Sequence, residues 1–218
     1  MRYLSYSLVV LAGCALVGAT PTRLPYDSWY LGFRAPRYME VWLETADVED
    51  VRGRVFPGAM SGTVAISYSG EAGGWGQRIS MGAGRDVTGA ALPKRIYVRW
   101  QSLVEPQTYR AVLDIPESTR RLMLSKARST TVPVVEEYRN ILTIALAPGG
   151  WVKAWVKSPG SKAVEILCQK AEIEPKGPDQ GKYEGRYVTL GPESKEYLRL
   201  HPVPYDSWKC PSATASVL

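Results

Sequence analysis

The chain has 218 residues, of which 45% are hydrophobic and 22% are charged, and its formal net charge is +6. This length can bury a substantial core, and the composition is that of a globular protein. Basic residues are spread along the chain without a long Lys/Arg run, which excludes a nucleic-acid-binding tail and fits an acidic protein or anionic lipid as partner.

The first segment is typical of a lipoprotein signal. Leu11-Ala12-Gly13-Cys14 closes a short apolar run, and small residues before a cysteine suit cleavage that leaves the cysteine first in the mature chain. We therefore expect a signal peptide at residues 1–13 and a tether at residues 14–25, with Cys14 carrying palmitate and diacylglycerol.

Two alternatives for this segment stay open. Cleavage after Ala19 would give a secreted or soluble periplasmic protein, and the true start could lie upstream of Met1. If Cys14 is lipidated, Ala15 after it favours the outer membrane over inner-membrane retention. We then expect the folded part on the periplasmic face of that membrane, held by its acyl chains.

Alternation of apolar and polar residues, interrupted by Gly and Pro, predicts a series of short strands. They cover residues 29–34, 38–45, 63–68, 95–103, 109–115, 138–146, 151–157, 163–171 and 186–190. Ala147-Pro148-Gly149-Gly150 separates two of them and predicts a hairpin turn, because Pro presets φ and Gly accepts positive φ.

Helix is expected only at residues 116–128, where Asp114 can cap the first turn, and at residues 192–198. So few helices argue against βαβ units. The fold class predicted is mainly β, an antiparallel β-sandwich or strongly curved sheet with one or two short helices, formed as a single domain by residues 26–218.

The three cysteines suggest one disulfide. With Cys14 lipidated, Cys168 and Cys210 remain as a pair in an oxidising compartment. A disulfide between them would contribute roughly 3–4 kcal/mol by loop-entropy models. Two separate buried thiols are the alternative.

A short motif occurs twice. Pro25-Tyr26-Asp27-Ser28-Trp29 recurs as Pro204-Tyr205-Asp206-Ser207-Trp208, without similarity around it. Pro and Asp-Ser favour turns, and each Trp can anchor its turn in a core. Chance recurrence is the alternative to a pair of neighbouring turns.

Catalytic signals are poor. His201 is the only histidine, so neither a His-rich metal set nor more than one Ser-His-Asp arrangement is available, and no Gly-x-Ser-x-Gly motif occurs. Residues 82–87 begin like a dinucleotide loop, but Val87 stands where the third Gly belongs. We expect no catalytic residues, no metal and no cofactor, although a hydrolase using Asp and Glu would leave no clearer trace.

The glycine-rich stretch 70–89 is the first candidate for partner binding. It carries Trp75, Arg78 and Arg85, and Trp and Arg dominate the energetics of protein interfaces. A plain surface loop is the alternative.

The strand 151–157 is the second candidate. Trp151, Lys153 and Trp155 share one of its faces, which could bind lipid headgroups, glycans or an acidic protein. Trp packed under a covering loop, with Lys reaching outward, is the alternative.

Several segments together resemble an uncharacterised family of proteobacterial lipoproteins. They are Trp-Tyr-x-Gly-Phe, Ala-Pro and Val-Trp-Leu-Glu within residues 29–44, Leu92-Pro93 through Trp100-x-Ser102-x-x-Glu105, the strand at 109–116, and 147–150 leading to Trp155. Relatives in that family are often encoded near type VI secretion phospholipase effectors. The resemblance implies an immunity protein that binds such an effector in the periplasm.

The hypothesis is thus a non-enzymatic lipoprotein that binds a protein partner, with Trp75, Arg78, Arg85, Trp151, Lys153 and Trp155 as the contact residues. The alternative is a structural or assembly lipoprotein that binds another envelope component.

Overall fold

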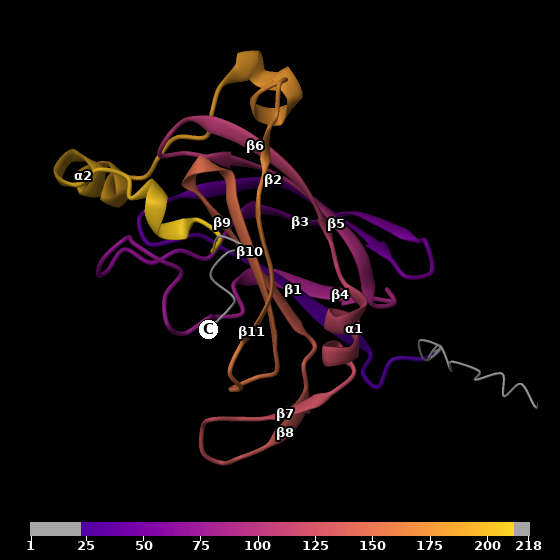
Figure 1. Ribbon diagram of the computed structural model, residues 1–218. Coiled ribbons are helices and arrows are strands. Elements are labelled where there is room, and N and C mark those ends of the chain that lie inside the picture. Colours follow the sequence, from indigo (N-terminus) through magenta and orange to yellow (C-terminus); the bar gives the residue numbers. More distant parts are fainter. Residues whose placement is uncertain (1–22, 212–218) are drawn as a thin grey trace, which may run out of the picture.

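The computed structural model describes residues 23–211, which form two five-stranded sheets packed face to face (Figure 1). Sheet A has the order β11 (Val164–Lys170), β10 (Trp151–Lys157), β9 (Ile141–Ala147), β1 (Ser28–Arg34), β4 (Ala83–Thr88). Sheet B has the order β12 (Glu172–Ile173), β6 (Gln107–Asp114), β5 (Pro93–Ser102), β2 (Val41–Asp50), β3 (Val55–Thr63). The predicted mainly β fold is confirmed.

Pairing within the sheets is mostly antiparallel, as expected. Among the described strands, β1 and β9 pair in parallel, with Tyr30 opposite Ile141 and Arg34 opposite Ala145. The chain passes from sheet A to sheet B between β11 and β12, and the segment after β3 returns it to sheet A at β4. The chain therefore connects the two sheets along both open edges of the sandwich, from β11 to β12 along one edge and from β3 to β4 along the other.

One core lies between the sheets. Trp29, Leu31 and Phe33 of β1 are fully buried there together with side chains from both sheets. Successive side chains of a strand point to opposite faces. The face that carries the apolar residues of the alternating pattern is therefore the one that points into the core.

Two predicted strands are wrong. Residues 64–68 form no strand apart from an isolated bridge between Ala65 and Arg34, and the strand before them, β3, was not predicted. Pro57, Gly58 and Gly62 are tolerated because β3 is an edge strand with register shifts against β2. The same residues interrupt the alternation of apolar and polar side chains by which a strand is predicted. Residues 186–190 form no strand either.

The helices are α1 (Glu117–Met123) and α2 (Pro192–Leu200), with short 3-10 segments η1 (Pro148–Gly150), η2 (Pro178–Gly185) and η3 (Tyr205–Trp208). α1 is capped at Pro116 rather than Asp114, and it is shorter than predicted because residues 126–128 enter a small hairpin. The predicted turn between β9 and β10 is confirmed, with φ of 73° and 75° at Gly149 and Gly150.

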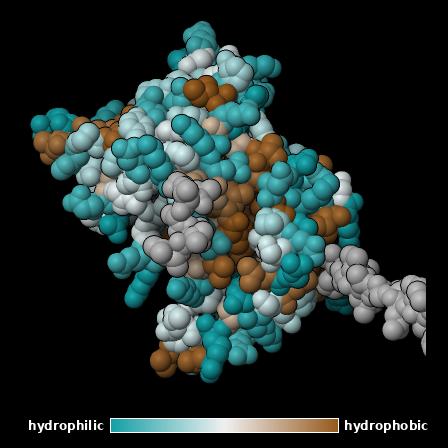
Figure 2. Space-filling model, viewed as in Figure 1, coloured by the Kyte–Doolittle hydropathy of each residue, from teal (hydrophilic) through white to brown (hydrophobic). Residues whose placement is uncertain are grey.

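The small hairpin consists of β7 (Lys126–Arg128) and β8 (Glu136–Tyr138) and projects from one end of the sandwich, at the bottom of Figure 1. Its turn carries Val132, which is 94% exposed, beside the exposed Val134 and Val135. Figure 2 shows hydrophobic residues at this same end, on a surface that is otherwise largely hydrophilic apart from a hydrophobic band down the middle of the visible face.

The glycine-rich stretch is only partly a loop. Its last third forms β4, at the edge of sheet A beside β1. A Cβ on Gly84 would lie 1.9 Å from the carbonyl oxygen of Leu31, so glycine at this position permits the close approach of the two backbones.

The two copies of the repeated motif occupy different surroundings. Trp29 is fully buried in the core between the sheets, where its Nε1–H donates to the carbonyl oxygen of Ala91. Trp208 is fully buried in a second, smaller cluster with Met39 and Ala147. Both tryptophans therefore anchor their segments, as expected.

The predicted signal peptide, Cys14 and most of the predicted tether lie outside the described residues. Within residues 23–211, no helix has the length and apolar character required to cross a bilayer.

Asp50, at the end of β2, holds the β2–β3 turn against the start of β5. Its buried carboxylate accepts hydrogen bonds from the backbone N–H groups of Arg52, Arg54 and Ala91 at 2.9–3.0 Å and from the Arg54 guanidinium at 2.7 Å. Burial alone raises the pKa of this carboxyl, but the hydrogen bonds outweigh burial, so the pKa lies below its usual value.

We predict that Asp50→Asn lowers the free energy of unfolding by about 2–3 kcal/mol at pH 7, because amide nitrogen cannot accept these hydrogen bonds. Since the folded-state pKa is depressed, the carboxylate stabilises the fold above about pH 4 and loses this effect as the pH falls through the folded value. Urea unfolding at pH 7 and pH 3 checks this. Asp114→Asn, at an exposed position, is the control and should change little; an equal loss at both pH values would contradict the prediction.

Candidate binding face on the outside of sheet A

β10 is buried on both faces. Val152, Ala154 and Val156 point into the core, as the alternation predicts, and are fully buried. On the outward face Lys153 and Trp155 are only 8% and 5% exposed. Something must therefore cover the outside of sheet A.

Part of that cover is the segment between β3 and β4, residues 64–82, here called the cover loop. The Thr143 hydroxyl on β9 donates to the carbonyl oxygens of Ser80 at 3.2 Å and Met81 at 3.3 Å. Lys157 on β10 donates from Nζ to the carbonyl oxygen of Ile79 at 2.9 Å. Side chains of sheet A thus hold the backbone of the cover loop in place.

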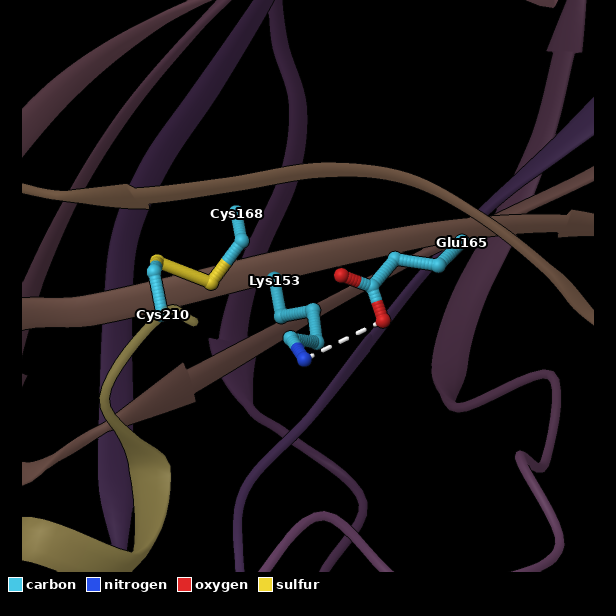
Figure 3. Close-up of a disulfide and its surroundings, with 4 residues drawn as sticks. All are labelled: Lys153, Glu165, Cys168 and Cys210. Atoms are coloured by element: carbon cyan, nitrogen blue, oxygen red, sulfur yellow. Dashed lines mark ion pairs between the residues drawn. A yellow bond between two sulfur atoms is a disulfide. The ribbon is translucent and has the colours of Figure 1, made fainter. Parts of the chain in front are cut away.

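Trp75, on the cover loop, sits over the predicted pair on β10. Its ring lies edge-to-face with that of Trp155, with centroids 5.9 Å apart, and the Nζ of Lys153 is 5.9 Å from the Trp75 centroid. Lys153 also forms an ion pair with Glu165 of β11 at 3.1 Å (Figure 3). Trp155 and Lys153 therefore lie between sheet A and Trp75 and contact the Trp75 ring. Trp75 is only half-buried, so its ring reaches the surface.

The rest of the cover is the C-terminal segment. The predicted disulfide is confirmed: Cys168 on β11 is bonded to Cys210, with Cα atoms 5.6 Å apart (Figure 3). Just before Cys210, fully buried Trp208 donates from Nε1 to the carbonyl oxygen of Gly74 at 3.1 Å. The C-terminal segment is thus fastened to sheet A and to the cover loop.

Two cavities lie beside Trp75. One, of about 600 Å³, is lined by Trp75, Arg78, Lys153 and Trp155 together with Lys157 and Lys162. Burial lowers the pKa of Lys157. The other, of about 470 Å³, is lined by Arg34, Arg37 and Arg78 beside the backbone of the cover loop. Both cavities are rich in cations, so their chemistry suits anionic groups.

The structure brings together four of the six predicted contact residues, since Trp75, Arg78, Lys153 and Trp155 line one cavity. Trp151 is half-buried at the start of β10, with the Nζ of Lys170 5.4 Å from its ring centroid, and packs against the Trp208 cluster. Arg85 is exposed on β4, with β9 and β1 between it and β10.

The predicted contact residues do not include Arg34, Arg37 or Lys157, although alternation along the strand 151–157 already puts Lys157 on the face of Lys153 and Trp155. The signal was partly visible: Arg34 ends β1 on the face opposite Leu31 and Phe33, and Lys157 ends β10 on the same side as Lys153 and Trp155. Nothing in the sequence indicated that the cover loop would pack over the ends of both β1 and β10.

Other chemistry is sparse in residues 23–211. They contain no group of three or more His, Cys, Asp or Glu side chains able to hold a metal ion. His201 is exposed directly after α2 and stacks on Tyr197, with ring centroids 4.4 Å apart.

The geometry defines a class: a β-sandwich protein with a cationic and aromatic face on the outside of one sheet. The family model described as "Protein of unknown function (DUF2931)" matches residues 17–206, so the chain belongs to this family. No curated protein and no solved structure matches the chain.

We predict that replacing Cys168 and Cys210 together by Ser lowers the free energy of unfolding by about 3–4 kcal/mol, because a link across 42 residues no longer restricts the unfolded chain. Denaturant unfolding measures the loss, and reductant added to the wild type should reproduce it. Cys14→Ser is the matched control. Identical unfolding midpoints for the double variant and the wild type would refute the prediction.

Proposed function

We propose that this protein is a lipid-anchored, periplasm-facing protein that binds a protein partner through the face around Trp75. The favoured partner is a secreted phospholipase effector, which the protein neutralises by covering its active-site mouth. The observation that carries the proposal is Trp75 itself, a half-buried ring on a glycine-rich loop, held over a fixed base and bordered by cations.

The base beneath Trp75 supports a binding role because it is already ordered. Trp155 is buried against the ring, and Lys153 is paired with Glu165, so these groups lose little freedom when a partner docks. Pre-organised aromatic anchors give affinity by lowering the entropic cost of association.

Charge supports an acidic partner surface. Arg78, Lys157 and Lys162 line the cavity of about 600 Å³ beside Trp75, and within the described residues none of the three forms an ion pair. Unpaired cations around an aromatic anchor accelerate encounter with an acidic surface and disfavour a basic one.

The lipid anchor and the phospholipase partner are supported by the sequence. Cys14 follows a signal-like segment, and the resemblance of residues 29–44 and 92–105 to lipoproteins encoded near phospholipase effectors suggests the class of partner. An anchor would raise the local concentration of the inhibitor at the membrane that the effector attacks.

We predict that the chain carrying Cys14→Ala, used as bait in envelope extract containing candidate effectors, retains a phospholipase at near-equal amounts. Trp75→Ala combined with Arg78→Ala should reduce recovery at least tenfold, since the anchor ring and its neighbouring cation are removed. Arg121→Ala, which removes an exposed cation on α1, is the matched control.

Recovery of a different envelope component in place of a phospholipase would refute the immunity role and favour the assembly lipoprotein. Repeated recovery of nothing, together with no protection against the candidate effector, would refute partner binding by this face.

A separate prediction concerns the anchor. Metabolic labelling with a palmitate analogue should mark the wild type and not Cys14→Ala, because the thiol is the attachment point. Fractionation should place the labelled protein in the outer membrane. Equal labelling of the two proteins, or a wild type found in the cytosol, would contradict the proposed anchoring.

A further inference from the structure

The cavity of about 470 Å³ next to Trp75 is not explained by the proposed function. Its walls carry Arg34 from the end of β1, Arg37 just after it, and Arg78 from the cover loop. We call this cavity the arginine pocket. Three arginines from two distant segments line this pocket because the cover loop crosses the end of β1.

The arginines of this pocket lack carboxylate partners. Within residues 23–211, Arg34, Arg37 and Arg78 form no ion pair, and the only protein acceptor that Arg34 reaches is the carbonyl oxygen of Arg78, at 3.4 Å. Glu71 also lines the pocket but pairs with none of them. Neighbouring cations that form no ion pair repel one another, and that repulsion is relieved when an anion binds between them.

Arg34 carries most of this cost. It is half-buried, and burial, with the like charge of Arg37 as the second cause, lowers the pKa of its guanidinium. Its Nη2 lies 3.7 Å from the position that a Cβ would take on Gly76, so the guanidinium is packed against the cover loop. Arg34 is thus held inside the pocket rather than free to extend into solvent.

The cover loop adds neutral donors. Within the described part of the chain, the backbone N–H groups of residues 73–78 donate no hydrogen bond to another protein group. Trp75 also lines the pocket, and its indole N–H is buried without a hydrogen-bond partner. Glycine-rich backbone with unused N–H groups beside arginines is the chemistry that holds phosphate oxygens.

We infer that the arginine pocket binds a phosphate group carried on a small molecule or a lipid headgroup. A carboxylate is matched by a single guanidinium, whereas three of them suit the higher charge and three oxygens of a phosphate monoester. A volume of about 470 Å³ falls within the range of small-molecule sites, about 300–1,000 Å³, and leaves room for the group that bears the phosphate. This inference does not depend on the proposed partner.

The test titrates the full chain carrying Cys14→Ala with inorganic phosphate and with glycerol 3-phosphate, at constant ionic strength, by calorimetry and thermal unfolding. Both ligands should bind and raise the unfolding temperature. Arg34→Gln should weaken binding at least tenfold, because it removes the buried guanidinium. Arg85→Gln removes an exposed arginine outside the pocket and should leave binding within twofold.

Stability without ligand separates loss of the site from loss of the fold. Arg34→Gln relieves like-charge repulsion in the pocket, so in phosphate-free buffer the variant should unfold at the same temperature as the wild type or higher. A variant that unfolds earlier and also fails to bind would mark Arg34 as a structural residue and overturn the inference.

The source of the phosphate is distinguished by vesicles of phosphatidylcholine with and without phosphatidic acid. Binding to vesicles that contain phosphatidic acid and not to pure phosphatidylcholine vesicles, with loss of that binding in Arg34→Gln, supports a membrane-borne phosphate. Binding of glycerol 3-phosphate without binding to either kind of vesicle supports a soluble phosphate ester. No response to any of these probes, an equal response to acetate, or equal weakening by Arg85→Gln would overturn the inference.

Discussion

The outside of sheet A has to be covered, and the rest of the site depends on this constraint. Every residue of β9 is buried, including Ile141, Ala145 and Ala147, so this strand has no face that could meet water without exposing apolar surface. The cover loop and the C-terminal segment supply the missing layer. The candidate binding face is consequently formed by a covering layer that packs on sheet A.

Cations in this covered region differ in how their charge is compensated. Lys153 is the most deeply buried and forms an ion pair with Glu165, whereas the half-buried Lys157 donates a hydrogen bond to a backbone carbonyl oxygen. Arg34 has only a distant carbonyl, and Arg78 at the surface has no ion pair within the described residues. A buried charge without a partner is costly, whereas an exposed one costs little. A structural role therefore fits Lys153, and ligand binding fits the incompletely compensated arginines near the surface.

The sequence pattern predicts those strands and turns that depend only on neighbouring residues. The bounds of β10 follow from its alternation, and the turn after β9 follows from Pro148 and its two glycines. The same pattern misplaced the strand near residue 63, because the glycines of β3 have no side chains to alternate. It also could not distinguish an exposed Trp155 from a covered one, since burial of the second face depends on residues about eighty positions earlier in the chain. The disulfide was predictable from the pairing of cysteines, but its role in fastening the cover was not.

Arg78 links the two cavities physically, because it and Trp75 line both of them. An anion in the arginine pocket would compete for this guanidinium, and an acidic surface docked beside Trp75 would draw it the other way. Two ligands that share one cation cannot bind with full independence, and linkage requires each to alter the affinity of the other by the same factor. The cover loop that carries Arg78 is tied to sheet A through the carbonyl oxygens of Ile79, Ser80 and Met81. The same loop is also held at Gly74, whose carbonyl oxygen accepts from the indole N–H of Trp208, so Trp75 and Arg78 lie between two fastened points of the loop.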